Sequence, residues 1–204
     1  MDLNTGDQQR QKRKKWQSIV STTVISIGVF LIVIAILASI KIPILKLYTN
    51  DRFQFSLKYP ASWQVIENPL KGLGVVAFKS LKEHPLDDFY ESLGITLTDL
   101  SKDPKTLKQF TALAMAGFLK PVGQNVRVLQ SREFRLAGQP AHRLIFETAQ
   151  PDNPLRFDVC WVIRPDTNMA YTLTYIGQKE DFQKYERLVK AMHRSFKFLK
   201  SPSD

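Results

Sequence analysis

The sequence predicts an α+β domain, an antiparallel β-sheet of about six or seven strands flanked by helices, preceded by one transmembrane helix. Three observations lead to this prediction. Several successive segments alternate apolar and polar residues, two others carry apolar residues at helical spacing, and one early run is free of charge. Alternation is typical of strands with one buried face, whereas apolar residues three and four apart are typical of amphipathic helices. Because the strands are largely consecutive and the helices stand apart from them, α+β is favoured.

The uncharged run covers residues 18–40, where Val, Ile, Leu and Phe dominate. As a helix it would be roughly 34 Å long, enough to cross a hydrocarbon core of about 30 Å. A cleavable signal peptide has an apolar core of only about 7–15 residues. A lipoprotein anchor needs a cysteine at the end of the run, and the only cysteine is Cys160. We therefore expect an uncleaved single-span anchor.

The charges on either side of this run predict its orientation. Residues 1–17 form a basic tail, while only Lys41 and Lys46 lie close on the other side. The cations of the tail are Arg10, Lys12, Arg13, Lys14 and Lys15. Because Lys and Arg are retained on the cytoplasmic side, we expect a cytoplasmic amino terminus and an extracytoplasmic carboxy-terminal domain, in the periplasm or the thylakoid lumen. An anionic-lipid or nucleic-acid patch is the alternative interpretation of the tail.

The formal net charge of +10 does not by itself indicate a nucleic-acid partner. Part of it comes from the tail, and the remaining basic residues are spread thinly along the chain. Nucleic-acid-binding surfaces concentrate basic residues and often interleave them with aromatics. No such run occurs beyond the predicted span, so no nucleic acid is expected as a partner.

After a short tether at residues 41–51, we expect the domain to occupy residues 52–199, with a tail at 200–204. Its first strand begins at Phe53, and apolar residues hold every second position up to Tyr59. Pro60 should end the strand, because proline has no backbone N–H to donate. Trp63 is expected to fold back over the apolar face.

The same alternation and a β-branched composition predict the remaining strands. They are expected at residues 75–80, 92–100, 126–136, 141–149, 155–164 and 169–177. In the strand at 155–164, Val159 and Trp161 share one face, so Asp158 and Cys160 share the other.

Two helices are expected. Asp103 followed by Pro104 is typical of an N-cap and a first helical position, and this helix should end before Pro121. Its apolar stripe would consist of Leu107, Phe110, Leu113 and Ala114. The second helix has a clearer periodicity, which indicates one face packed on a sheet. That face would consist of Phe182, Tyr185, Val189, Met192 and Phe196.

Familiar catalytic motifs are absent: there is no Gly-rich phosphate loop, G-x-S-x-G, H-E-x-x-H or paired C-x-x-C. The segment HPLDDFYE carries four potential metal ligands, His84, Asp87, Asp88 and Glu91. Their spacing would place them on one helical face, but Pro85 disfavours helical geometry at His84. We interpret the segment as a solvated acidic turn and predict no metal site, keeping the four residues as weak candidates.

Three further residues could carry chemistry. His142 alternates with apolar residues on a strand, which predicts a half-buried, hydrogen-bonded histidine rather than a general base. His193 is expected on the solvated flank of the second helix. Cys160 has no cationic neighbour that the sequence identifies, so we interpret it as a small packing residue rather than a thiolate nucleophile. No catalytic residue is predicted.

Five segments carry a resemblance to a known family: FQFSLKYPASW, VVAFKS, GITLTDL, VLQSREFRLAGQPAHRLIFET and AYTLTYIGQKEDFQKYERLVKAMHRSF. With these segments in this strand order, the domain resembles the PsbP family of extrinsic photosystem II proteins. The resemblance covers residues 48–199 and implies an antiparallel sheet sandwiched by helices, without enzymatic activity. Family members attach to the lumenal face of photosystem II, supporting its calcium and chloride, or assist assembly of photosynthetic complexes. No metal-binding residue of the family maps onto this chain, so calcium is only an implication of the resemblance and no cofactor is predicted.

The sequence thus predicts a single-span membrane protein whose PsbP-like domain binds and helps assemble or stabilise a membrane complex, photosystem II being one candidate. The expected partner is a membrane protein or complex, and residues 18–40 contact the bilayer. The alternative is an envelope ligand-binding or sensory domain without catalytic activity. An enzyme that uses Cys160 or the cluster around His84 is a third and weaker hypothesis.

Overall fold

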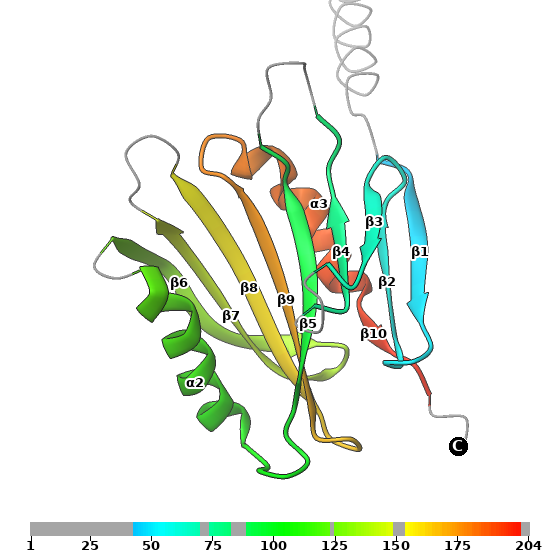
Figure 1. The fold of residues 1–204 in the computed structure, drawn as a ribbon, viewed down its shortest axis with the longest axis vertical. Coiled ribbons are helices and arrows are strands. Elements are labelled where there is room, and N and C mark those ends of the chain that lie inside the picture. Colours follow the sequence, from blue (N-terminus) through cyan, green and yellow to red (C-terminus); the bar gives the residue numbers. More distant parts are fainter. Residues whose placement is uncertain (1–42, 70–73, 83–88, 123–124, 149–153, 201–204) are drawn as a thin grey trace, which may run out of the picture. The chain divides into compact units, whose positions relative to one another are not determined.

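The computed structural model describes residues 43–69, 74–82, 89–122, 125–148 and 154–200. They form two antiparallel sheets and two α-helices, which confirms the predicted α+β class (Figure 1). No helix among these residues is long and apolar enough to cross a membrane. The predicted span at residues 18–40 and the basic tail lie outside the described residues, so the anchor and its orientation stay predictions.

The larger sheet has seven strands in the order β3-β4-β5-β9-β8-β7-β6, and every neighbouring pair is antiparallel. Its strands are β3 (Gln64–Glu67), β4 (Val76–Lys79), β5 (Ser92–Asp99), β6 (Val126–Leu136), β7 (Gln139–Thr148), β8 (Leu155–Arg164) and β9 (Met169–Gln178). Six of them coincide with predicted strands. The short β3 was not expected, because it follows Trp63 in a segment without a clear alternation.

The smaller sheet contains β1 (Leu45–Asn50), β2 (Phe55–Pro60) and β10 (Lys197–Phe198), in the order β1-β2-β10. Most of the expected tether at 41–51 is therefore part of the fold: β1 pairs with β2 along its whole length. None of its residues is buried, so the sequence lacks the apolar face by which a strand is recognised. Backbone hydrogen bonds to β2 hold it, together with the half-buried ring of Tyr48, which packs against Phe55 and Phe78.

The helix α2 (Leu107–Leu119) begins three residues later than expected, and a short 3₁₀ turn, η1 (Lys120–Val122), follows it. Its N-cap is Thr106, whose Oγ1 accepts a hydrogen bond from the Gln109 backbone N–H at 3.3 Å. The Gln109 side chain accepts in turn from the Thr106 backbone N–H at 2.9 Å. This capping box satisfies the free amides of the first turn, so Asp103 and Pro104 remain outside the helix.

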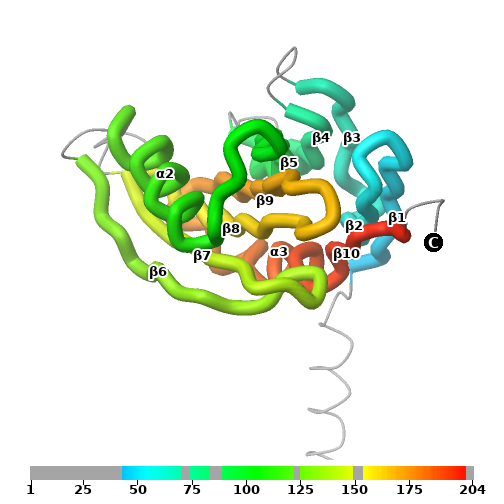
Figure 2. The backbone as a smooth tube through the Cα atoms, turned by 90° about the horizontal axis from the view of Figure 1, so that it is seen from below, coloured from blue at the N-terminus to red at the C-terminus, as the bar shows by residue number. Residues whose placement is uncertain are grey.

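The helix α3 (Phe182–Ser195) confirms the predicted apolar face, since Phe182, Val189 and Met192 are buried. Figure 2 shows α2 and α3 on opposite sides of the sheet formed by β7, β8 and β9. Under α2, Phe110 packs into an apolar core with Leu144, Phe146, Val159, Trp161 and Ala170. Leu113, expected on the same stripe, is instead 57% exposed.

A second core lies on the α3 side and joins the two sheets. Trp63 packs there with Phe55 and Leu57 of β2, as predicted. Arg164, at the end of β8, fixes the junction: its guanidinium donates to the carbonyl oxygens of Gln54 and Leu199, both at 3.1 Å. The sheets therefore share apolar packing and partly buried hydrogen bonds.

Candidate functional site

The two faces of β7 and β8 differ sharply in polarity. On the α2 side, Leu144 and Phe146 lie in the apolar core. The alternate residues point to the α3 side, where β7 carries Arg143 and β8 carries Asp158. The main strand contacts of α3 are with β2 and β9 rather than with β6, β7 or β8. Charged side chains thus occupy a part of the sheet that the helix leaves incompletely covered.

Arg143 and Asp158 form a buried ion pair at the base of this region. Arg143 is 6% exposed and Asp158 is 1% exposed. The guanidinium donates from Nε to Oδ1 at 2.7 Å and from Nη2 to Oδ2 at 2.5 Å, the bidentate geometry that planar arginine and carboxylate groups favour. The hydrogen bond to Asp158 raises the pKa of Arg143.

Arg132 on β6 lies directly opposite Arg143 in the β6–β7 register. Like charges placed opposite each other on neighbouring strands destabilise a sheet. Arg132 is exposed, and within the described residues no carboxylate forms an ion pair with it. The Arg132–Arg143 pair therefore has one carboxylate, Asp158, for two positive charges.

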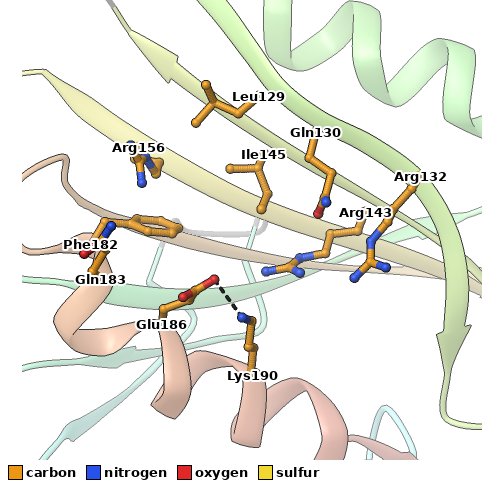
Figure 3. Close-up of a pocket in the computed structure, with 10 residues that line it drawn as sticks. All are labelled: Leu129, Gln130, Arg132, Arg143, Ile145, Arg156, Phe182, Gln183, Glu186 and Lys190. Carbon is orange, nitrogen blue, oxygen red and sulfur yellow. Dashed lines mark ion pairs between the residues drawn. The ribbon is translucent and has the colours of Figure 1, made fainter.

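Two adjoining hollows open over these strands beside α3. One has a volume of about 370 Å³ and the other about 240 Å³, and Arg132, Arg143 and Lys190 line both. In Figure 3, Arg132 and Arg143 extend from the sheet toward α3, and Lys190 and Glu186 extend from α3 toward the sheet. The cations that line the two hollows are Arg132, Arg135, Arg143, Arg156, Lys190 and Arg194. We call this surface the basic groove.

Carboxylates neutralise only half of these cations. Asp158 pairs with Arg143, Glu147 pairs with Arg156, and the Glu186 carboxylate lies 2.7 Å from Lys190. Glu147 is also shared with cations outside the groove. The groove therefore carries an excess of positive charge, which makes it suited to anions rather than to metal cations.

Cys160 is buried next to the groove, and His193 lines the smaller hollow. His193 was expected on a solvated flank, but it is 6% exposed, because α3 turns this residue toward β8. Its Nδ1 is 3.6 Å from Cys160 Sγ, and its Nε2 is buried without a hydrogen-bond partner among the described residues. Burial lowers the pKa of His193. Burial, and next the Asp158 charge, raise the pKa of the Cys160 thiol well above its usual value.

This environment disfavours both a thiolate nucleophile and a metal. A reactive cysteine needs a lowered pKa and access to a substrate, whereas Cys160 is fully buried and burial raises its pKa. Asp158, Cys160 and His193 could offer ligand atoms within 4.8 Å of one another. However, both Asp158 oxygens already accept hydrogen bonds from Arg143, and a metal ion there would face its guanidinium charge. The cluster does not fit a metal.

Of the weak metal candidates, His84, Asp87 and Asp88 lie outside the described residues. Glu91 is buried and its carboxylate accepts a hydrogen bond from Ser80 Oγ at 3.0 Å. The absence of a metal site in this segment stays a prediction.

His142 lies as expected, half-buried and hydrogen-bonded. Its Nε2 is 2.8 Å from Ser131 Oγ, and its ring stacks on Trp161 with centroids 5.1 Å apart. Burial lowers its pKa. It lies on the α2 side of the sheet, away from the basic groove, and its contacts are those of a packing residue.

The sequence reasoning missed the groove. The available signal was the charge at Arg143 and Asp158 inside otherwise apolar strands, since charges are rarely buried unless they are paired. Convergence with Arg132 and Lys190 depends on strand register and on the position of α3, neither of which the pattern specifies.

A model of the PsbP family matches residues 44–198. The chain belongs to the PsbP family. Among solved structures, it is similar to cyanobacterial PsbP (CyanoP) from Synechocystis sp. PCC 6803, at 14% identity and a TM-score of 0.59, covering 78% of this chain and 95% of that one. A comparison with curated proteins found no match.

Other similar structures come from different biological settings. LpqN, involved in cell envelope biogenesis of Mycobacterium tuberculosis, has 11% identity and a TM-score of 0.57, covering 76% of this chain and 92% of LpqN. The Ran-binding protein Mog1p of Saccharomyces cerevisiae has 9% identity and a TM-score of 0.55, covering 78% and 97%. At these identities the likeness shows a common fold, and a fold hosts many functions.

Proposed function

We propose that this PsbP-family chain is a single-span membrane protein whose extracytoplasmic domain binds and helps assemble or stabilise a membrane complex, without catalysing a reaction. The observation that carries the proposal is where the fold begins. β1 starts at Leu45, so only residues 41–44 separate it from the predicted span at 18–40. Four residues reach at most about 14 Å when fully extended.

Exposed apolar side chains at this point support the proposal. Ile44 is 78% exposed and Leu47 is 63% exposed. Isolated apolar residues are common on protein surfaces. These two, however, are next to the predicted span, where contact with the interfacial layer of a bilayer would remove them from water.

A tether this short has a functional consequence. It confines the domain to a thin layer above the bilayer, which raises its effective concentration for partners in the same membrane. Soluble partners gain nothing from the confinement. The expected partner is therefore a membrane protein or complex. The PsbP resemblance makes photosystem II one candidate, and the LpqN likeness makes a cell-envelope complex another.

The chemistry around Cys160 is in keeping with a non-catalytic role, because a buried thiol of raised pKa is a poor nucleophile. Cys160→Ala should therefore leave the association with the partner complex intact. A folded, normally abundant Cys160→Ala protein that has lost biological function would contradict the non-enzyme proposal.

Orientation is tested by protease treatment of intact spheroplasts. The carboxy-terminal domain should be digested while the amino-terminal tail is protected. Protection of the domain until detergent is added would contradict the predicted topology.

The tether is tested by inserting a long Gly/Ser linker after Lys41. We expect weaker co-purification with the membrane complex and weaker complementation of a deletion strain. The control is an insertion of equal length after Lys102, in the exposed connection between β5 and α2. Full complementation by the domain released without its anchor, at native abundance, would refute the proposal.

A further inference from the structure

The basic groove has hydrogen-bond donors that the protein itself does not use. A guanidinium carries five N–H donors, and Asp158 accepts from two of those of Arg143. The described residues accept no other hydrogen bond from the Arg143 guanidinium, and Arg143 lines both hollows. Because Arg143 lines both hollows, its remaining three donors are open to water or to a group that enters the groove.

The register places a second guanidinium next to these donors. Arg132 lies directly opposite Arg143, and Lys190 approaches the same space from α3. Without a further anion, two like charges oppose each other across neighbouring strands. An anion held among Arg132, Arg143 and Lys190 would replace this repulsion with charge-assisted hydrogen bonds.

We propose that the basic groove binds the phosphate group of a phosphate monoester, held by Arg132, Arg143 and Lys190. A monoester presents three terminal oxygens and close to two negative charges, which matches three converging cationic groups. The larger hollow continues from these cations to Leu129, Ile145 and Phe182, so the organic part of the ligand is apolar on at least one side. Its volume of about 370 Å³ lies within the usual range for small-molecule sites.

The phosphate could come from a soluble organic phosphate or from a phosphatidate headgroup, and the probes distinguish these sources. Isothermal titration calorimetry of the full-length chain in a neutral detergent would use phenyl phosphate and water-soluble dihexanoylphosphatidic acid. We expect saturable binding of phenyl phosphate at one site per chain. Binding should weaken below about pH 6, where the monoester loses its second charge. Clearly tighter binding of the phosphatidic acid would identify a lipid headgroup as the source.

Arg132→Gln and Glu186→Gln test the residues of the groove, Lys108→Gln is the control, and Lys190→Gln is held in reserve. Arg132→Gln removes an exposed donor and should lower phosphate affinity tenfold or more, because hydrogen bonds to charged groups are strong. Glu186→Gln removes the partner of Lys190 and should raise the affinity. Lys108→Gln, which removes one exposed charge on α2 outside the groove, should leave the phosphate affinity unchanged. Lys190→Gln repeats the test if Arg132→Gln does not fold, as judged by circular dichroism.

The proposal is overturned if neither probe binds at concentrations up to about 10 mM, a level that corresponds to negligible affinity. It is also overturned if Arg132→Gln binds as well as the wild type, or if Lys108→Gln weakens binding as much as Arg132→Gln. The last result would indicate attraction to net charge rather than a site. None of these outcomes depends on the membrane partner, so the tether proposal stands or fails separately.

Discussion

The buried Arg143–Asp158 ion pair allows a quantitative test of what stabilises the domain. Asp158→Asn keeps the shape of the side chain but leaves the guanidinium without a counter-charge at a position that is 6% exposed. Removing one partner of a buried pair costs about 3–5 kcal/mol. Because Arg143 borders the groove and retains some access to water, we expect about 3 kcal/mol. For a domain of this size that lowers Tm by about 6–12 °C.

Denaturant unfolding of the full-length chain, followed by tryptophan fluorescence, would measure this loss, since Trp63 and Trp161 are buried. Arg143→Met and the double variant, which carries both Asp158→Asn and Arg143→Met, complete a double-mutant cycle. The double variant should cost at least about 2 kcal/mol less than the sum of the single costs, because it leaves no unpaired charge. Glu186→Gln is the control, since the side chains of Lys190 and Glu186 are 40% and 37% exposed and exposed pairs contribute at most about 1 kcal/mol. A cost of Asp158→Asn below about 1 kcal/mol, or additive single costs, would refute the reasoning.

Three further predictions concern single side chains. Cys160→Ala should lower the free energy of unfolding by only about 1–2 kcal/mol, because a small buried group is lost. A larger loss in a denaturant titration would indicate a structural role of the thiol. Arg164→Met should lower the free energy of unfolding by about 2–4 kcal/mol, because the carbonyl oxygens of Gln54 and Leu199 lose a charged donor. An unchanged denaturation midpoint would show that the junction between the sheets does not need this guanidinium. Burial lowers the pKa of His193, so as the pH falls the unfolded chain takes up a proton at this residue before the folded chain does. The contribution of neutral His193 to the free energy of unfolding is therefore complete above about pH 6.5 and is lost as the pH drops below that value. His193→Gln should flatten this decline more than His142→Gln, whose ring is less buried, and equal slopes in denaturant titrations at several pH values would contradict the assignment.

The elements that the sequence predicted well are those whose burial is one-sided. In α3, apolar residues face the core and charged residues face solvent, so the period of the pattern gives both the helix and its orientation. In β8, the alternation correctly separated Trp161 from Cys160. In both cases the hydrophobic effect acts locally, residue by residue, and the sequence records it directly.

The elements that the sequence missed depend on contacts between distant segments. β1 has no fully buried residue, and its backbone pairing with β2 and the packing of Tyr48 against the core hold it in place. His193 was placed on the wrong side of α3, because a polar residue next to an apolar stripe was assumed to face water. Its burial follows from the position of β8 beneath the helix, where Cys160 contacts its ring. No local pattern contains that information.

Arg143 links the stability of the domain to the proposed ligand site, because one guanidinium serves both. Its Nε and one Nη2 donor hold Asp158, and the same side chain lines both hollows of the groove. A phosphate bound there stabilises the folded state by about 2.7 kcal/mol at a concentration one hundred times its Kd. Asp158→Asn should therefore have two opposite effects: it lowers the stability of the free protein, and it tightens phosphate binding because the groove loses a neighbouring negative charge. A variant that was merely misfolded would lose stability and binding together. Measuring both quantities on Asp158→Asn distinguishes an electrostatic role of this pair from a simple packing role.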